Sequence, residues 1–379
     1  MIEEIRKLRK ELHQNPEVSG AEFHTANRIR SFIQKHHNTE IIENLGGTGL
    51  AAVYDFGGVG TTVTIRCELD ALPIQEINEF DHQSKSSGVS HKCGHDGHMA
   101  IVAGLVFWIK EQSFTSGKII LLFQPAEETG KGAYAVLQDE RFLALQTDYI
   151  FALHNIPQEP IYQIIIAEKG FSAEVQSCII TLKGKESHAS EPENGHNPAL
   201  AISEIIATLS GFNVADPEEE NFTILTPIHI KMGQPSYGIS PANGELHYTL
   251  RTWSTEKMSV LKTKMERNVE NSCTSQNLDY TIEWLEYFPA SSNHPESIPY
   301  VIEAAKANGF KIKQRSYPFK FGEDFGWFTK GYKTTMFGLG AGLETPALHN
   351  SDYDFPDEII ETGMIMFQSL ISDILSYNK

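Results

Sequence analysis

The stretch HKCGHDGH, residues 91–98, brings three histidines, one cysteine and one aspartate into a single octet. Imidazole, thiolate and carboxylate groups are ligands that zinc and related divalent metals prefer in proteins. The octet lacks the usual four ligands of a closed zinc site. Taken alone, it is compatible with a structural zinc knuckle, a redox thiol or one half of an open metal site, and any missing ligands must come from elsewhere in the chain.

Further acids and histidines follow apolar runs of the sequence. These runs are short, continuous and bounded, which is typical of strands buried on both faces of a sheet. The runs and the polar residues that come after them are TTVTIRC (61–67) with Glu68 and Asp70, KIILLF (118–123) with Glu127 and Glu128, DYIFAL (148–153) with His154, and TTMFGLG (334–340) with His349.

Helical patterns lie between several of these runs, for example at residues 98–112. The alternation predicts an α/β fold with a mostly parallel sheet and helices on both faces. In such sheets, ligands bind beyond the carboxyl ends of the strands. We therefore expect the polar residues that follow the runs to meet at one edge.

Together these residues offer nitrogen, oxygen and sulfur donors for zinc or a similar divalent ion. Adjacent carboxylates at a strand end can divide the work: one binds metal, while the other activates a metal-bound water and passes its proton to a leaving nitrogen. Taken singly, each residue has a simpler interpretation, such as a structural histidine, a solvated acidic pair or an inert buried thiol. Their repeated position after buried strands favours a joint site.

The middle of the chain has a different pattern. Alternating strands occupy residues 172–289, interrupted by helical stretches near 197–211 and 255–275. This pattern predicts an α+β unit with an antiparallel sheet. We expect a metal-binding catalytic domain at 1–171 and 290–379, split by an inserted lid or dimerisation domain at 172–289.

Composition limits the function classes. The chain has 379 residues, with 31 Lys and Arg against 49 Asp and Glu, a formal net charge of -18. Such an acidic balance argues against nucleic acid or an anionic membrane as partner. No stretch approaches the roughly 20 apolar residues of a membrane span, and the N-terminus lacks the apolar core of a signal peptide. Four scattered cysteines without a CxxC pair favour a reduced, cytoplasmic protein.

The motifs together resemble those of the aminoacylase/carboxypeptidase family of metallohydrolases. The most similar branch is that of amidohydrolases such as hippurate hydrolase, indole-acetyl amino-acid hydrolase and N-acetyl-diaminopimelate deacetylase. The resemblance runs nearly end to end. It is carried above all by CGHDGH (93–98) and QPAEE (124–128), and is supported by ELDALPIQE (68–76), SHAS (187–190), GEDF (322–325) and ALHNSDYDF (347–355).

The resemblance implies two divalent metal ions, with Zn, Mn, Co and Ni all open as the native metal. The metal ligands that it implies are Cys93, His95, Glu128, His154 and His349, with Cys93 in the bridging position. Glu127 is similar to the general acid/base, and Asp70 to an aspartate that supports catalysis beside a metal histidine. His13, His91 and His98 belong to the same motif stretches, and for these we expect orientation or packing roles.

Two residues of the expected inserted domain also match the family pattern. His188 resembles the residue that polarises the scissile carbonyl, in some relatives across a dimer. Arg251 lies near an arginine that can hold a substrate carboxylate. Polar surface positions are the simpler interpretation of both. Glu68, where Asp is usual, and the changes at Tyr248 and Gly238 fall around the substrate side, so they affect the substrate class more than the hydrolysis.

The sequence therefore predicts a metal-dependent amidohydrolase of N-acyl amino acids, acting as a homodimer through the inserted domain. A dipeptidase or carboxypeptidase of the same family, which would take a short peptide, is an alternative. A non-catalytic metal-binding protein on the same scaffold is another.

Overall fold

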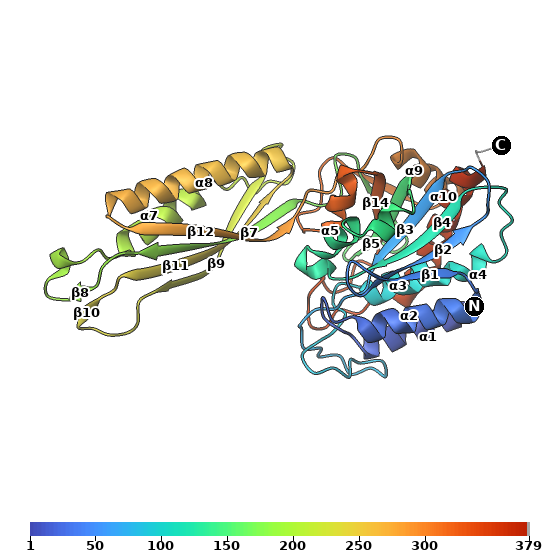
Figure 1. The fold of residues 1–379 in the computed structure, drawn as a ribbon, viewed down its shortest axis with the longest axis horizontal. Helices are drawn as coiled ribbons and strands as arrows, with labels where there is room; N and C mark the ends of the chain where they lie inside the picture. The colour runs from blue at the N-terminus through green and yellow to red at the C-terminus, as the bar shows by residue number, and fades with distance from the viewer. Residues whose placement is uncertain (377–379) are drawn as a thin grey trace. The chain divides into compact units, whose positions relative to one another are not determined.

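The computed structural model describes residues 1–376 and divides into two compact units (Figure 1). Unit 1 comprises Met1–Phe171, Ser291–Ser316 and the chain from Glu323 onward, and unit 2 comprises Ser172–Ala290 and Tyr317–Gly322. The segment Tyr317–Gly322 differs from the sequence expectation, which assigned all of 290–379 to the first unit. It belongs to unit 2 because the backbone N–H of Ala173 bonds to the carbonyls of Phe319 and Phe321, at 3.0 and 3.1 Å.

Unit 1 contains an eight-stranded sheet in the order β1-β2-β4-β3-β5-β14-β6-β13. Its four central strands, β4, β3, β5 and β14, run parallel to one another, whereas β1, β2 and the β14–β6 pair add antiparallel contacts. The strands are β1 (Glu40–Leu45), β2 (Gly49–Asp55), β3 (Thr62–Glu68), β4 (Lys118–Gln124), β5 (Tyr149–Ile156), β6 (Ile164–Ala167), β13 (Ile312–Arg315) and β14 (Lys333–Gly340). The mostly parallel catalytic sheet expected from the sequence is confirmed.

Both faces of this sheet are covered, which explains why its central strands are continuous apolar runs. Alternate residues, such as Ile65 and Phe123, face a core shared with α1, α3 and α10, while short helical elements pack on the other face. The helical elements of unit 1 are α1 (Ile2–Gln14), α2 (Phe23–His36), α3 (His95–Gly104), α4 (Val106–Ile109), η1 (Glu127–Thr129), α5 (Gly132–Leu137), α6 (Glu140–Leu143), α9 (Ile298–Ala307), η3 (Asp324–Lys330), η4 (Asp357–Ile359) and α10 (Ile360–Ser376).

Three local features differ from the pattern or extend it. Strand β1 was not predicted, because its EIIENL sequence carries charges at exposed positions of an edge strand. The GGTG stretch, residues 46–49, turns β1 into β2, with Gly46 and Gly47 at positive φ. Helix α3 begins at His95 and not near His98, because Gly94 closes the preceding loop in the left-handed conformation.

Among residues 1–376, one helix is long and apolar enough to cross a membrane, namely α10 taken together with the η4 turn. The expectation that no stretch of the sequence approaches this length was therefore wrong. Most of the apolar stretch of this helix is buried in unit 1, where Phe367, Leu370 and Ile371 join the main core. Its apolar character is that of a core helix.

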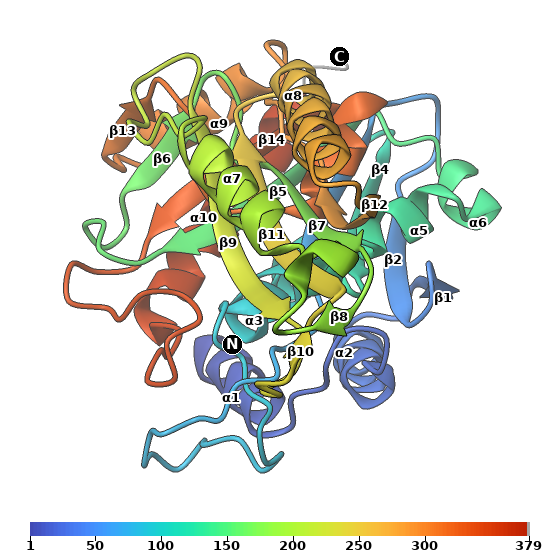
Figure 2. The same cartoon turned by 90° about the vertical axis from the view of Figure 1, so that its left-hand side faces the viewer.

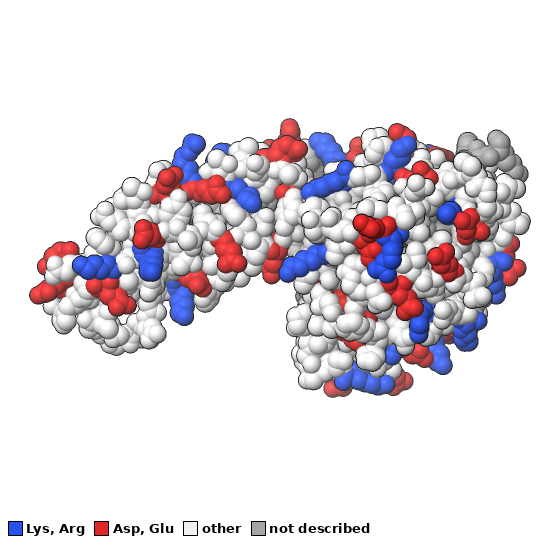
Figure 3. All heavy atoms as spheres, in the orientation of Figure 1, with Lys and Arg blue, Asp and Glu red and all other residues white. Residues whose placement is uncertain are grey.

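Lys and Arg side chains are interspersed with Asp and Glu on the face drawn in Figure 3.

Unit 2 holds a four-stranded antiparallel sheet in the order β12-β7-β11-β9, as expected for an α+β unit. Helices α7 and α8 pack together on this sheet (Figure 2), where the apolar core includes Ile180, Leu246 and Met265. The elements of unit 2 are β7 (Glu174–Lys183), β8 (Ser187–His188), η2 (Pro192–Asn194), α7 (Ala199–Ser210), β9 (Thr223–Met232), β10 (Ile239–Ser240), β11 (Asn243–Thr252), α8 (Thr255–Ser275) and β12 (Asp279–Phe288).

Candidate active site

The carboxyl ends of four neighbouring parallel strands bring the candidate residues of unit 1 together. Asp70 lies just past β3, Glu127 and Glu128 form the η1 turn after β4, and His349 lies in the loop after β14. His154 is still inside β5, which continues to Ile156, so it does not follow the strand as the apolar run suggested. The strand order places these residues at one edge of the sheet.

The HKCGHDGH octet is held at this edge by a glycine that no other residue can replace without strain. Gly94 has φ 97°, and a Cβ atom there would lie 2.5 Å from Oδ1 of Asn155. The resulting tight loop places the buried Cys93 and His95 on either side of Gly94, at the start of α3.

Backbone carbonyls fix the orientation of two of the histidine rings. Nδ1 of His95 lies 2.8 Å from the carbonyl oxygen of Asp70, and Nδ1 of His154 lies 2.8 Å from that of Asn155. Because a carbonyl can only accept, both Nδ1 atoms donate, and each neutral ring keeps its lone pair on Nε2. This is the arrangement by which proteins prepare a histidine to bind metal.

The donor atoms form two groups that share Cys93. In one, ligand atoms of Cys93, His95 and His154 all lie within 4.8 Å of one another, and Sγ of Cys93 is 3.5 Å from Nε2 of His154. In the other, Cys93 is joined by Glu128 and His349, whose Oε2 and Nε2 atoms are 3.8 Å apart. Cys93 is common to both groups, so these residues together would hold a pair of ions.

Unsatisfied buried atoms support a cation at this position. Oδ1 of Asp70, Nε2 of His95 and Oε1 of Glu128 are buried without a hydrogen-bond partner within residues 1–376. Buried polar atoms are rarely left unpaired, because each costs free energy. Three such atoms in a set of nitrogen, oxygen and sulfur donors fit divalent metal ions.

The charges of the site shift its pKa values in the direction that metal ions would relieve. Burial alone would lower the pKa of His95, yet its contact with the Asp70 carboxylate and the charges of Glu68 and Glu128 raise it to about 10. Burial raises the pKa of Glu128 to about 7. Carboxylates crowded in a buried site hold protons unless a cation takes their place.

Glu127 is the carboxyl group that is best placed to exchange a proton. It is buried, its Oε2 lies 3.8 Å from Nε2 of His95, and its Oε1 accepts a long hydrogen bond of 3.3 Å from the backbone N–H of Asp324. Burial, and then the nearby charges of Glu323 and Glu128, raise the pKa of Glu127 well above its usual range. A raised proton affinity suits a group that must take up a proton and later return it.

Asp70 connects the strand-end loops through one oxygen. Its Oδ2 accepts hydrogen bonds from the hydroxyl of Ser19, at 2.6 Å, and from the backbone N–H of Glu128, at 2.9 Å. Its Oδ1 lies 3.5 Å from Nδ1 of His95. The Asp70 carboxylate thus contacts a candidate metal histidine and also holds the turn that carries both glutamates.

Sequence reasoning did not single out a buried arginine at the centre of the charge network. Arg66 in β3 donates to Gln124 at 2.8 Å, to Glu323 at 2.9 Å and to Asp324 at 2.8 Å, and it also bonds to Glu68. A charged residue inside a continuously buried strand was the available signal. Glu323 and Asp324, which belong to the GEDF motif, both accept hydrogen bonds from Arg66. The backbone N–H of Asp324 also donates to the carboxyl group of Glu127.

Glu68, which stands where Asp is usual, lies in this buried network and not on the substrate side, so the sequence expectation for it was wrong. Its Oε2 lies 2.6 Å from Nδ1 of His98, and Nε2 of His98 lies 2.5 Å from Oδ1 of Asn155. Both nitrogens of His98 are therefore engaged in hydrogen bonds. His13 is likewise bound on both sides, to Asp96 at 2.8 Å and Glu76 at 2.9 Å.

His188 and Arg251 belong to unit 2, and the structure does not group them with the donors of unit 1. His188 is exposed in β8, and its Nδ1 accepts from the backbone N–H of Ser190 at 3.1 Å. The neutral ring then carries its proton on Nε2. Arg251 lies in β11 and donates from Nη1 to the carbonyl of Lys320 at 2.7 Å.

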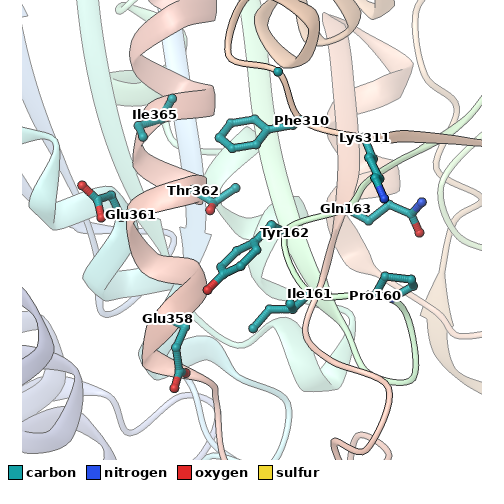
Figure 4. Close-up of a pocket in the computed structure, with 11 residues that line it drawn as sticks. Pro160, Ile161, Tyr162, Gln163, Phe310, Lys311, Glu358, Glu361, Thr362 and Ile365 are labelled. Atoms are coloured by element: carbon teal, nitrogen blue, oxygen red, sulfur yellow. The ribbon is translucent and has the colours of Figure 1, made fainter.

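A separate cavity of about 590 Å³ lies in unit 1 between the β5–β6 loop, the loop before β13 and helix α10 (Figure 4). Tyr162, Phe310 and Ile365 line it, and its described lining includes none of the candidate site residues. The metal donors therefore do not line this cavity.

Comparisons with known proteins identify the family of the chain. The model of peptidase family M20/M25/M40 matches residues 64–373. Hippurate hydrolase of Campylobacter jejuni is 28% identical over 369 residues, covering 97% of this chain and 95% of the relative.

Two solved structures share the fold over nearly the whole chain. The Bacillus subtilis YXEP protein, described as a dinuclear metal binding peptidase from the M20 family, is 26% identical with a TM-score of 0.84, covering 99% of this chain and 98% of that one. A structure from methicillin resistant Staphylococcus aureus is 24% identical with a TM-score of 0.89, covering 99% and 97%.

Proposed function

The chain belongs to peptidase family M20/M25/M40 and is a metal-dependent hydrolase of amide bonds, and from this premise we propose that its substrates are N-acyl amino acids. The pair of donor groups sharing Cys93, with Glu127 beside them, supports the hydrolysis, and the similarity to a hippurate hydrolase supports this substrate class. Hippurate, which names the activity of one relative, is benzoylglycine and therefore an N-acyl amino acid.

The residues that would hold two divalent ions are Cys93, His95, His154, Glu128 and His349, with Cys93 as the bridge. When bound, such ions lower the pKa of a water, toward about 7 in favourable cases, and polarise a carbonyl oxygen. Their identity, among Zn, Mn, Co and Ni, follows availability as much as ligand type.

Glu127 would act as the general acid/base. Its buried carboxylate takes a proton from the attacking water and returns it to the departing amine, for which its raised pKa is suited. Asp70 fixes the loop geometry through Ser19 and the N–H of Glu128, and so supports the same step.

Two residues of unit 2 would serve the substrate. His188 has its Nδ1 occupied by Ser190, so its Nε2–H is available to donate to the oxyanion that develops during attack. Arg251 is oriented by its bond to the Lys320 carbonyl, and we assign it to the free carboxylate of the amino acid.

Association of two copies would occur through unit 2. Strand β9 is an edge strand of its sheet, and its apolar side chains Ile228, Ile230 and Met232 are exposed. An exposed apolar edge strand favours pairing with a second chain. The four cysteines are all free and buried, which supports our assignment to the reducing cytoplasm.

The proposed function is tested by a substrate panel before and after chelation. Acetyl- and benzoyl-amino acids should be hydrolysed, and activity should disappear with chelator and return with added Zn, Mn, Co or Ni. Dipeptides provide the comparison within the same family. Failure to cleave any N-acyl amino acid with the metals loaded would contradict the proposal, and cleavage of dipeptides alone would assign the chain to the peptidases.

A further inference from the structure

The turn that presents both glutamates has a backbone conformation that its own residue does not favour. Ala126, directly before Glu127, has φ 51° and ψ 40°, in the left-handed region. An alanine is disfavoured there because its Cβ crowds the backbone, and such residues persist only where the surroundings impose them. Something outside the turn must therefore hold Ala126.

Glu22 is a side chain from a distant part of the chain that contacts Ala126 itself, whereas Asp70 contacts the turn at Glu128. Oε1 of Glu22 accepts a hydrogen bond of 2.8 Å from the backbone N–H of Ala126. The same oxygen accepts from the N–H of Gly20 at 2.9 Å, and Oε2 accepts from the hydroxyl of Thr48 at 2.6 Å. Glu22 is fully buried, and its three donors come from three separate segments of unit 1.

A buried carboxylate is costly unless donors compensate it, so a Glu used only to fill space at this position would be a poor choice. The hydrogen bond from Ala126 is charge-assisted, which makes it stronger than a neutral one. Inside the turn, the Ala126 carbonyl accepts from Thr129 at 3.1 Å and from Gly132 at 3.2 Å. These bonds close the turn but leave the Ala126 N–H to Glu22.

We propose that Glu22 is a positioning residue, which holds the left-handed turn at Ala126 and thereby fixes Glu127 for proton transfer and Glu128 for metal binding. The inference rests on the proposed function for the roles of those two glutamates. Glu22 itself touches neither substrate nor the reacting atoms. Its effect on the reaction passes through the backbone of Ala126.

Rescue at position 126 distinguishes positioning from a purely structural role. Glycine adopts the left-handed conformation at no steric cost. If Glu22 acts by holding this conformation, Ala126→Gly should restore part of the activity that Glu22→Ala loses. Glu22→Gln keeps an acceptor oxygen at the same place and should retain kcat within about threefold.

Glu17 offers a matched control in the same segment. Its carboxylate accepts hydrogen bonds from the N–H of Thr25 at 2.7 Å and from the Thr25 hydroxyl at 2.8 Å, at the start of α2. Within residues 1–376 it forms no hydrogen bond with the η1 turn. Glu17→Ala should lower Tm without lowering kcat.

The experiment measures kcat on benzoylglycine, metal affinity by titration with Zn²⁺, and hydrogen exchange of the 124–131 peptide in the chelated protein. Glu22→Ala should lower kcat at least tenfold, weaken Zn²⁺ binding and speed exchange of this peptide. Adding Ala126→Gly should recover at least threefold of the lost kcat without recovering Tm.

Two results would overturn the inference: a Glu22→Ala enzyme with wild-type kcat and peptide exchange, or a loss of kcat that Ala126→Gly does not reduce. If Glu22→Ala does not fold, single variants decide. Ala126→Val, which resists the left-handed region, should then slow turnover, while Ala126→Gly should not. A wild-type enzyme that hydrolyses no amide refutes the proposed function, while the exchange and metal-binding results still judge the role of Glu22.

Discussion

The buried ion network around His13 predicts a loss of stability at alkaline pH. His13 in α1 is bound on both sides, by Asp96 in α3 and by Glu76, so it ties the N-terminal helix to the helix that begins at His95. Burial alone would lower the pKa of His13. Its hydrogen bond to Asp96, the charge of Asp96 and its hydrogen bond to Glu76 together raise the pKa to about 9.

The sign and size of the effect follow from linkage. A group whose folded pKa lies above its unfolded value stabilises the fold fully below the unfolded pKa and loses that contribution as pH rises through the folded pKa. The folded value of about 9 exceeds the ordinary value of 6.5 by about 2.5. At about 1.4 kcal/mol for each tenfold change in proton affinity, this gives about 3 kcal/mol, lost between about pH 6.5 and 9.

The assay must report on unit 1 alone, because a protein of two units need not unfold in one step. Cys67 is buried in β3, so its pulsed alkylation in increasing urea follows the unfolding of unit 1, while Cys178 and Cys273 follow unit 2. The free energy of unfolding would be measured from pH 6 to pH 10 in the wild type and in His13→Gln. The difference between the two proteins removes the contribution of other titrating groups.

The wild type should lose about 3 kcal/mol more than His13→Gln across this range. A wild type and a His13→Gln variant whose unfolding free energies change in parallel with pH would refute the reasoning.

Three further predictions concern the site and the proposed assembly. Cys93→Ala should reduce bound metal from two ions per chain to less than one, whereas His349→Ala should remove about one; equal losses in elemental analysis would contradict a bridging thiolate. Arg251→Gln should raise KM at least tenfold for benzoylglycine but not for its amide, which lacks the carboxylate; an equal change for both would remove Arg251 from substrate recognition. Ile230→Lys, on the exposed edge of β9, should convert a dimer to a monomer in analytical ultracentrifugation, and an unchanged mass would place the interface elsewhere.

The sequence predicted those parts of the site that depend on strand order. Apolar runs identify buried strands, and the ends of parallel neighbours must share an edge, so Glu127 and His349 could be expected together despite their separation in the chain. The tautomers of His95 and His154 could not be predicted, since they depend on which carbonyl each ring meets after folding.

The parts that sequence reasoning missed depend on long-range packing. Arg66 is bound by Glu323 and Asp324, which are far away in the chain, and a single charge in a strand does not reveal its partners. The assignment of Tyr317–Gly322 to unit 2 depends on backbone hydrogen bonds to Ala173, which side-chain patterns do not encode. Strand β1 was not predicted, because too few positions of this edge strand are buried to give a clear hydrophobic pattern.

The most direct test of the central claim is to measure kcat and bound metal on the same sample of Glu127→Gln. Glutamine keeps the shape of the side chain but can neither accept the proton of the attacking water nor return it to the amine. General acid/base catalysis typically contributes about 100- to 10,000-fold. We expect two ions per chain, as in the wild type, and a kcat on benzoylglycine that is at least about 100-fold lower. Wild-type turnover with both ions bound would contradict this expectation.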